Sequence, residues 1–507
     1  MSSTGSPGRT PGSPVIRARQ LVGATSASAA TTLWLALLGL LTTPYMLHEL
    51  GAAAYGVFAL ITIVSAYLSN LEFGFGHALV RFAARAHATG DEVQERRVLE
   101  TSLAVFFAAA LVAGGAAFLL APRVVRSFAT VPAGIQDEAV NAARYGAGIL
   151  FFALMATFFQ STLAGLGRFQ AVVAMRAIGG TLISASAVAT VAFGGELDDV
   201  LLVQLLVGSV SFLVLAALVS GRGRWLLPRF HRPTASEMAR YAGFVFLAGL
   251  AYQLMLQGPP TVLAGHVDTA ELATYTVPAI VLQQVTLLAT SASLGFLPLA
   301  SAESASADRS RLAAIFRSHV RLSLLVMGPI AAYLAIFAEP LLATWIDADF
   351  AAEAADPLRF LSAAAIVLAI SGPPADVARG LGRPAWIVAY TVSAAALEIV
   401  LALALVSRHG AAGVAAGMWI GLTLATLPLL LIVARRLLDL PSAALAAAVA
   451  PVLLAVLALT GLYAAGAALG GAFAGAIVTG TIATAAYAAV VWTKVLDDGE
   501  RRALSRR

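Results

Sequence analysis

The segment Leu50–Arg85 reads LGAAAYGVFALITIVSAYLSNLEFGFGHALVRFAAR and decides the fold class of the chain. Its apolar part, Gly51–Leu71, carries no charged residue, and Glu72 and Arg81 follow it. An apolar helix of this length crosses a hydrocarbon core about 30 Å thick. Glu72 lies roughly 13 Å along such a helix from Arg81, and therefore near mid-membrane if Arg81 marks the cytoplasmic boundary. A charge at that depth costs at least about 2.5 kcal/mol, so Glu72 is expected to face a cavity or a partner.

A stripe of basic side chains follows on the same predicted helix. His77, Arg81 and Arg85 are four residues apart, which places them on one helical face. Glu72 is about half a turn out of phase with Arg81 on a straight helix, and Gly74 could bend the helix and reorient it. The alternative interpretation is that the arginines are membrane-boundary anchors and that a neighbouring helix neutralises Glu72.

The composition of the whole chain is that of a polytopic membrane protein. Of its 507 residues, 60% are hydrophobic and only 12% are charged, and the mean hydropathy is +0.86. Soluble domains carry about 25% charged residues. The absence of cysteine excludes thiol catalysis and thiolate metal sites. Lys494, the only lysine, follows Thr493 and not glycine, which excludes a Walker A loop and transport driven by ATP at such a loop.

Apolar runs long enough to cross a bilayer occur fourteen times. They cover residues 21–47, 53–80, 99–121, 143–165, 171–194, 200–220, 241–264, 272–300, 322–345, 358–379, 385–406, 411–433, 443–465 and 471–493. With the N-terminus in the cytoplasm, 27 of the 32 basic residues fall on the cytoplasmic side. The other side keeps only Arg123, Arg126, Arg144, Arg359 and Arg408. This bias predicts a multi-pass membrane protein with both termini in the cytoplasm. The heavy use of Ala and Arg with a single lysine indicates a GC-rich bacterial genome, and therefore a bacterial plasma membrane.

An internal repeat divides the chain into two halves. Gly165–Arg168 and Gly380–Arg383 both read GLGR and lie 215 residues apart, after the fourth span of each six-span half. An even number of spans per half makes the repeat parallel. The predicted fold is therefore all-α, with about 14 transmembrane helices in two six-helix lobes related by a parallel pseudo-two-fold, and two extra C-terminal helices. The predicted units are a disordered cytoplasmic tail (1–20), the N-terminal lobe (21–240), the C-terminal lobe (241–437), helices 13 and 14 (438–493) and a basic cytoplasmic tail (494–507).

The motifs in the opening segment carry a resemblance to a known family. Leu50-Gly51, Tyr55-Gly56 and Glu72-Phe73-Gly74 ahead of Arg81 resemble the polysaccharide-transport branch of the multidrug/oligosaccharidyl-lipid/polysaccharide (MATE-like) exporter superfamily. Glu72 stands where that pattern often has aspartate. The resemblance implies two lobes around a central cavity, alternating access and flipping of lipid-linked oligosaccharides from the inner to the outer leaflet. It implies no enzyme activity, cofactor or metal.

Arginines are the candidate ligands for a polyprenyl diphosphate, because guanidinium binds phosphate with two hydrogen bonds and stays charged. The candidates near the inner mouth of the proposed cavity are Arg17, Arg81, Arg176 and Arg240. Each of them also obeys the positive-inside rule, which is sufficient to explain it as an anchor.

Four further residues are candidates for ion coupling or for pairing with these arginines. They are Glu72, His77, Asp376 and Glu398. Glu398 has no charged neighbour within nine residues, so it needs a partner from another helix. A structural ion pair is the alternative for each. Two proline pairs, Pro259-Pro260 and Pro373-Pro374, are expected to interrupt spans seven and ten.

Three other functions stay open from the sequence. A cation-coupled small-molecule or multidrug exporter of the same superfamily would have an anionic or aromatic cavity. An integral-membrane glycosyltransferase or polymerase is supported only by Asp347-Ala348-Asp349, which resembles a DxD motif on a short outer loop. A membrane scaffold for surface-polymer assembly is the third. The expected partners are the lipid-linked substrate, the bilayer and polysaccharide-assembly proteins, and neither nucleic acid nor ATP.

Overall fold

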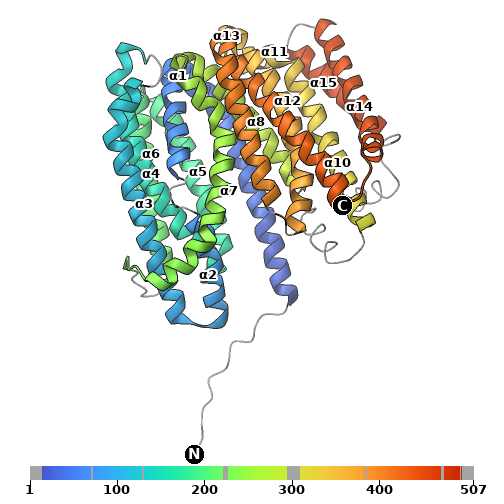
Figure 1. Ribbon diagram of the computed structural model, residues 1–507. Coiled ribbons are helices and arrows are strands. Elements are labelled where there is room, and N and C mark those ends of the chain that lie inside the picture. Colours follow the sequence, from blue (N-terminus) through green and yellow to red (C-terminus); the bar gives the residue numbers. More distant parts are fainter. Residues whose placement is uncertain are drawn as a thin grey trace, which may run out of the picture.

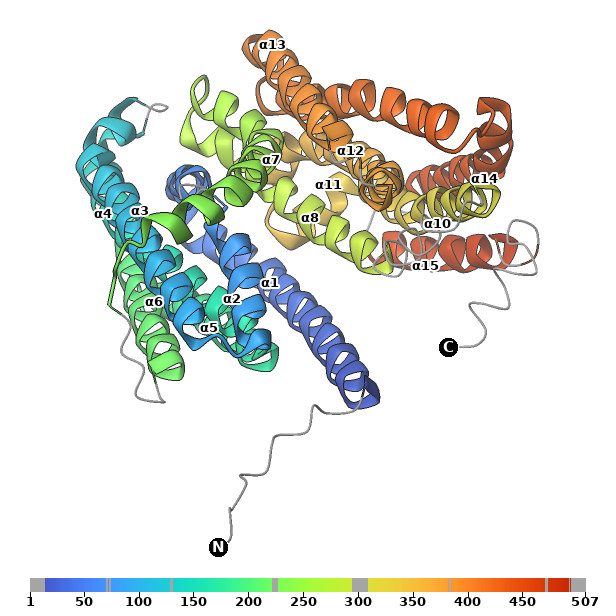
Figure 2. The same ribbon diagram turned by 60° about the horizontal axis from the view of Figure 1, so that its bottom comes forward.

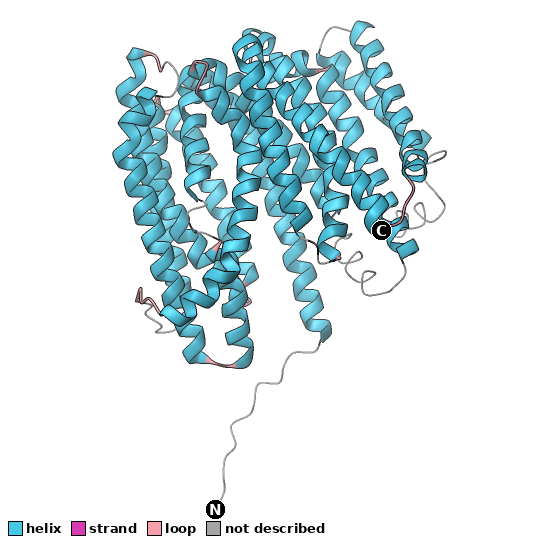
Figure 3. Ribbon diagram, viewed as in Figure 1, coloured by secondary structure: helices cyan, strands magenta, loops and turns pink. Residues whose placement is uncertain are grey.

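The computed structural model describes residues 14–69, 72, 74–127, 131–220, 227–293, 309–381, 383, 385–469, 473–491 and 493. Over this part of the chain the regular structure is helical and contains no strand (Figure 3). The first lobe contains α1 (Pro14–Ser69), α2 (Phe75–Thr89), α3 (Glu92–Ser127), α4 (Gln136–Gly165), α5 (Phe169–Ala192) and α6 (Leu197–Ser220). The rest of the chain contains α7 (Arg232–Ala264), α8 (Thr269–Ser293), α10 (Arg309–Ile336), α11 (Ala338–Trp345), α12 (Ala348–Gly380), α13 (Ala385–Ile432), α14 (Ser442–Leu469) and α15 (Phe473–Val490).

The helices form two bundles that stand side by side. α1 to α6 pack in one bundle and α7 to α15 in the other, with the first half of α1 and α8 along the seam (Figures 1 and 2). Nine of the described helices are long and apolar enough to cross a membrane. The all-α membrane fold predicted from the sequence is thereby confirmed, and the described helices are consistent with fourteen crossings.

Two of these helices are too long for one crossing. A straight helix of 56 residues, the length of α1, would measure about 84 Å. Gly51 breaks α1 with φ 80° and ψ 160°, and Gly410 breaks α13 with φ 48° and ψ −132°. Positive φ is accessible to glycine at little cost, because it has no Cβ. Each of these helices therefore contains two spans joined by a glycine.

The repeated GLGR motif forms equivalent turns in the two bundles. The Arg168 N–H donates to the carbonyl oxygen of Leu163 at 2.8 Å, and the Arg383 N–H donates to that of Ala378 at 2.8 Å. Both acceptors lie five residues before the arginine, as in the turns that end helices on a left-handed residue. Gly167 has the left-handed φ of 74° that this turn requires. The turns therefore support the internal repeat.

The two bundles are joined by an apolar core at the end of the molecule opposite the N-terminus. Its buried side chains come from both bundles and include Met46, Leu47, Val57 and Leu201 on one side and Ala273, Val277, Leu342, Ala351 and Leu358 on the other. The Trp345 indole N–H also crosses between bundles, donating to the carbonyl oxygen of Leu40 at 3.0 Å. This end of the interface is therefore closed by packed side chains.

The expectation for the proline pairs was wrong. α7 runs continuously through Pro259 and Pro260, and α12 runs continuously through Pro373 and Pro374. All four prolines are buried. Neighbouring helices restrain proline-containing spans in a membrane bundle, so proline is tolerated there.

Candidate functional site

The predicted basic stripe lies on the outer face of α2. His77, Arg81 and Arg85 are exposed, whereas the opposite face of α2 is buried against α3 and α4. The Arg81 guanidinium carbon lies 4.6 Å from the centre of the Tyr241 ring on α7. An arginine at this distance over an aromatic face is attracted by the negative charge of the ring face. Arg81 of α2 therefore contacts the first helix of the other bundle.

The other arginine candidates are distributed over three helices. Arg240 is exposed and precedes Tyr241 on α7, so the structure brings it to a helix that contacts the helix of Arg81. Arg176 is exposed on α5, which packs against α1 and α6. Arg17 lies in the first turn of α1, and its side chain is outside the described part of the chain. The helices of Arg81 and Arg240 are thus in contact, and the grouping of Arg17, Arg81, Arg176 and Arg240 around a substrate stays a prediction.

The Glu72 carboxylate lies beside the first turn of α2. Gly74 has a left-handed φ of 72° and caps the start of α2, which separates α2 from α1. A Cβ at Gly76 would lie 3.1 Å from Oε2 of Glu72 and 3.4 Å from Oγ of Ser161. The carboxylate therefore lies against the first turn of α2, where unpaired backbone N–H groups carry partial positive charge. Oε2 is buried and accepts no hydrogen bond within the described residues.

Glu398 is the most enclosed of the acidic candidates. It lies in the first half of α13, its side chain is fully buried, and neither carboxylate oxygen has a hydrogen-bond partner among the described residues. The cluster around it contains Tyr275 and Met418, whose hydroxyl and sulfur are 3.6 Å apart. A buried charge without a partner is costly, so the carboxyl group needs a proton or a cation.

The remaining acidic candidates have local partners. Asp376 is half-buried on α12, and its Oδ1 lies 3.5 Å from the guanidinium of Arg379 one turn later on the same helix. Asp347 of the DxD-like motif is the N-cap of α12, and its Oδ1 accepts the Phe350 N–H at 2.7 Å. A capping side chain of this kind stabilises the start of a helix. The structure therefore gives Asp347 a structural role and removes the only sequence feature that suggested a glycosyltransferase.

A ladder of glycines in α13 was missed by the sequence interpretation. Gly413, Gly417 and Gly421 lie four residues apart and face the first half of α13. A Cβ at Gly413 would lie 2.6 Å from the carbonyl oxygen of Leu405, and one at Gly421 would lie 2.8 Å from the backbone nitrogen of Glu398. Small residues at this spacing let membrane helices approach closely. The spacing alone could have revealed this contact, which holds Glu398 in place.

The Tyr-Gly motif marks the contact between the bundles. Tyr55 is buried, and a Cβ at Gly56 would overlap the carbonyl oxygen of Thr269 at the start of α8. Only glycine therefore lets the second half of α1 approach the backbone of α8 this closely. The motif that carries the family resemblance is thus a contact of the closed end.

Two family models match the sequence. The model described as polysaccharide biosynthesis protein matches residues 22–302, which is more than half of the chain. The chain belongs to the polysaccharide biosynthesis protein family. The MatE model matches residues 246–404, which lie largely in the second bundle. Comparison with curated proteins gave no match.

Solved transporters share the fold of this family member. Lipid II flippase MurJ in an inward closed conformation is 13% identical, with a TM-score of 0.76 over 92% of this chain and 98% of that chain. An inward-facing multidrug resistance MATE family transporter of the MOP superfamily is 16% identical, with a TM-score of 0.66 over 80% of this chain and 98% of that chain. A MOP superfamily transporter from Pyrococcus furiosus is 15% identical, with a TM-score of 0.59 over 82% and 95%. The chain thus has the fold of MOP-superfamily transporters and flippases, as the resemblance implied.

Proposed function

We propose that this member of the polysaccharide biosynthesis protein family flips a polyprenyl-diphosphate-linked oligosaccharide across the bacterial plasma membrane by alternating access. Its family match supports a role in making a surface polysaccharide, and its fold is shared with a protein described as a lipid II flippase. The observation that carries the proposal is the exposed cationic stripe of α2, whose Arg81 reaches α7.

The arginines act on the headgroup of the substrate. Arg17, Arg81, Arg176 and Arg240 bind the diphosphate with forked hydrogen bonds as it enters from the cytoplasm. Because Arg81 and Arg240 lie on contacting helices of different bundles, a diphosphate between them would link the two bundles. Its passage would therefore be coupled to movement of one bundle against the other.

The closed end of the interface is the gate to the outer leaflet. The apolar core and the close contact of Gly56 with Thr269 hold the bundles together at the end opposite the N-terminus. The arginine bias predicts that this end is extracytoplasmic. The described conformation therefore corresponds to a stage of the cycle in which that exit is shut.

Glu398 is the preferred coupling residue. It takes up a proton or a cation because its carboxylate is fully buried without a partner among the described residues. The secondary candidates are Glu72, His77 and Asp376. Glu72 lies beside the start of α2, His77 is exposed, and Asp376 is paired with Arg379.

Polymer export in cells tests the proposed headgroup contacts. Arg81→Ala and Arg176→Ala are each expected to reduce export, while Arg359→Ala serves as the control because Arg359 lies on α12 with its own partner, Asp356, at 2.6 Å. Wild-type export in both Arg81→Ala and Arg176→Ala would show that these arginines do not carry the substrate.

A cation-coupled multidrug exporter is the second candidate function. It is favoured by the MatE match over residues 246–404, a range that contains Glu398. A cationic drug would require an anionic passage, so the exposed arginine stripe argues against it. Transport of cationic dyes that is abolished by Glu398→Gln and unchanged by Arg81→Ala would favour this function.

A further inference from the structure

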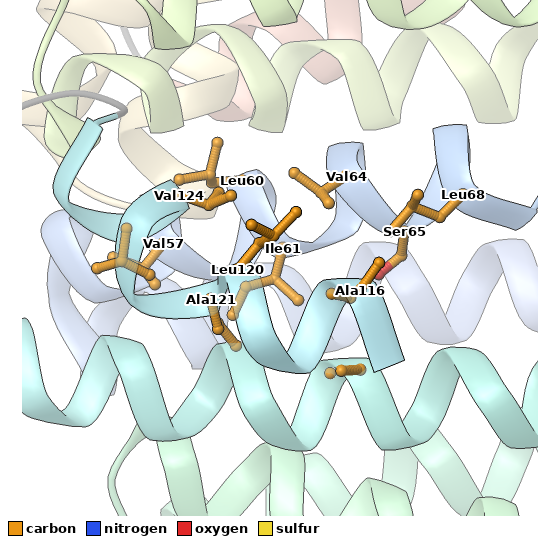
Figure 4. A pocket seen from close by; sticks show the side chains of 15 residues that line it. Val57, Leu60, Ile61, Val64, Ser65, Leu68, Ala116, Leu120, Ala121 and Val124 are labelled. Carbon is orange, nitrogen blue, oxygen red and sulfur yellow. The ribbon is translucent and has the colours of Figure 1, made fainter. Parts of the chain in front are cut away.

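An apolar cavity of about 160 Å³ lies inside the first bundle, between the second half of α1 and the facing parts of α3 and α4 (Figure 4). Ser65 is the only polar side chain among the residues that line it. Leu120 lines the cavity and is 43% exposed, and its neighbour Leu119 is 76% exposed on the surface of α3. The cavity therefore borders the surface that would contact lipid, and a hydrocarbon chain could enter it.

Small residues of α3 and α4 create the hollow. α3 contributes Ala116 and Ala121, and α4 contributes Ala143, Gly146 and Ala147. An apolar cavity of similar size in a soluble protein stays dry and binds small hydrocarbons. The lining from Ala116 to Val125 covers about 14 Å along α3, so the hollow is elongated in the direction of a lipid chain.

Basic residues flank the end of this cavity that lies opposite the N-terminus. Arg123 lies between lining residues Ala121 and Val124 of α3, Arg126 follows lining residue Val125, and Arg144 lies beside lining residue Ala143 on α4. All three arginines are exposed, and the Arg144 guanidinium carbon lies 5.5 Å from the centre of the Phe118 ring. They are three of the five basic residues predicted to lie outside the cytoplasm.

These arginines are available to an anion. None of the three takes part in an ion pair within the described part of the chain. Acidic side chains gather at the starts of α4 and α6, where Glu138, Glu196 and Asp198 have carboxylate oxygens within 4.8 Å of one another. Two carboxylates of this region accept backbone N–H groups at the start of α6. Glu138 Oε1 accepts the Leu197 N–H at 2.8 Å, and Asp199 Oδ2 accepts the Glu196 N–H at 3.2 Å.

We propose that this crevice binds a phosphate-headed lipid of the leaflet opposite the N-terminus, with its hydrocarbon chain in the apolar cavity and its phosphate on Arg123 and Arg144. The apolar lining with its exposed residue Leu120 matches the hydrocarbon chain of such a molecule, and the guanidinium groups without an ion pair among the described residues match its phosphate. The site lies within one bundle, so it does not depend on what crosses between the bundles, and the proposal stands even if the transported substrate is another compound.

Photolabelling of the full-length protein in phosphatidylcholine nanodiscs tests the site. The probe is a polyprenyl phosphate with a diazirine near the middle of its chain, and the neutral polyprenol with the same diazirine is its control. Labelled peptides from α1, α3 and α4 are mapped by mass spectrometry. Arg123→Gln and Arg144→Gln are each expected to lower labelling of the crevice about fivefold, the contribution of one basic residue near an anionic lipid surface. Arg408→Gln is the matched control, since Arg408 is an exposed arginine of α13 at the same predicted side.

Filling the cavity provides an independent test. Ala116→Phe and Val64→Phe approach the hollow from α3 and α1, and each is expected to abolish labelling inside it. Ala108→Phe on the exposed face of α3 should leave labelling unchanged. An unchanged thermal unfolding temperature shows that a filled variant is folded. Because there are two variants, the test still works if one of them does not fold.

The possible outcomes separate the parts of the proposal. The proposal is supported if labelling of the crevice is lost both when an arginine is replaced and when the cavity is filled. If millimolar inorganic phosphate also abolishes that labelling, the arginines bind free phosphate as well as a lipid phosphate. Equal labelling by the neutral polyprenol overturns the role of the arginines. Labelling spread over all lipid-facing helices and unaffected by Ala116→Phe and Val64→Phe overturns the site.

Discussion

Gly56→Ala tests whether the Tyr-Gly motif closes the two bundles against each other. The added Cβ would lie 2.5 Å from the carbonyl carbon and 2.9 Å from Cα of Thr269, and closer still to its carbonyl oxygen. Carbon atoms in favourable contact lie about 3.5–4.0 Å apart, so α1 and α8 must separate by roughly 1 Å. The obstacle is backbone, which cannot rotate away as a side chain can.

The expected size of the effect follows from the cost of overpacking. Inserting a methyl group into a tightly packed contact costs about 1–3 kcal/mol. This cost falls only on the conformation in which α1 touches α8, so the equilibrium between closed and open exits should shift about 5- to 150-fold toward the open one.

Spin-label distances between the bundles measure this shift. The chain has no cysteine, so Asn141→Cys on α4 and Glu353→Cys on α12 give two unique labels at exposed positions of the closed end. Gly56→Ala should populate a longer distance between them. Gly115→Ala is the control, since no atom lies within 4 Å of its added Cβ. A distance distribution of Gly56→Ala that matches the control would refute this account of the gate.

Four further substitutions have defined outcomes. Gly421→Ala should cost about 1–3 kcal/mol and lower the unfolding temperature, because its Cβ would approach the backbone nitrogen of Glu398 to 2.8 Å, while Gly461→Ala, with open space around it, should not. Glu398→Gln should keep the fold, by circular dichroism, and abolish the dependence of transport on a proton or sodium gradient; a retained dependence would exclude Glu398 as the coupling residue. Asp347→Ala should cost about 1 kcal/mol through loss of the N-cap and leave transport intact, and a complete loss of activity in a folded variant would restore the DxD interpretation. Arg81→Gln should lower the apparent affinity for the diphosphate substrate, as measured by the substrate dependence of transport, and an unchanged affinity would argue that Arg81 only anchors α2 at the membrane boundary.

Much of the fold follows from the sequence because hydrophobic length and arginine bias are strong physical signals. The membrane has a fixed thickness, so the apolar runs of the chain predict crossing helices directly. The repeated GLGR turns were also visible in the sequence, since a tight turn after a helix needs glycine at a fixed place.

The sequence was less informative where neighbouring helices decide the outcome. Pro259 and Pro374 look like helix breakers locally, yet packing keeps their helices continuous. Gly74 was recognised as a position that could bend the helix, and in the structure its left-handed conformation marks the start of a separate helix, α2. The four-residue spacing of Gly413, Gly417 and Gly421 indicates a close helix contact, but it does not show that the partner of Gly421 is the backbone at Glu398.

The shared face of the basic residues was predictable, whereas their role in binding stays a prediction. His77, Arg81 and Arg85 lie on one exposed face of α2, as four-residue spacing in a helix predicts. The contact of Arg81 with Tyr241 was not predictable, because it joins residues 160 positions apart on helices whose packing had to be known. Asp347 resembled a catalytic carboxylate only because the sequence does not show where α12 begins.

Flipping of a fluorescent polyprenyl-diphosphate oligosaccharide in proteoliposomes tests the central claim most directly. The wild-type protein should move the lipid to the opposite leaflet, where a membrane-impermeant quencher reports it, and Arg81→Ala combined with Arg240→Ala should reduce the rate to that of protein-free vesicles. The same rate in wild-type and protein-free vesicles, while cationic dyes are transported by the same preparation, would contradict the account.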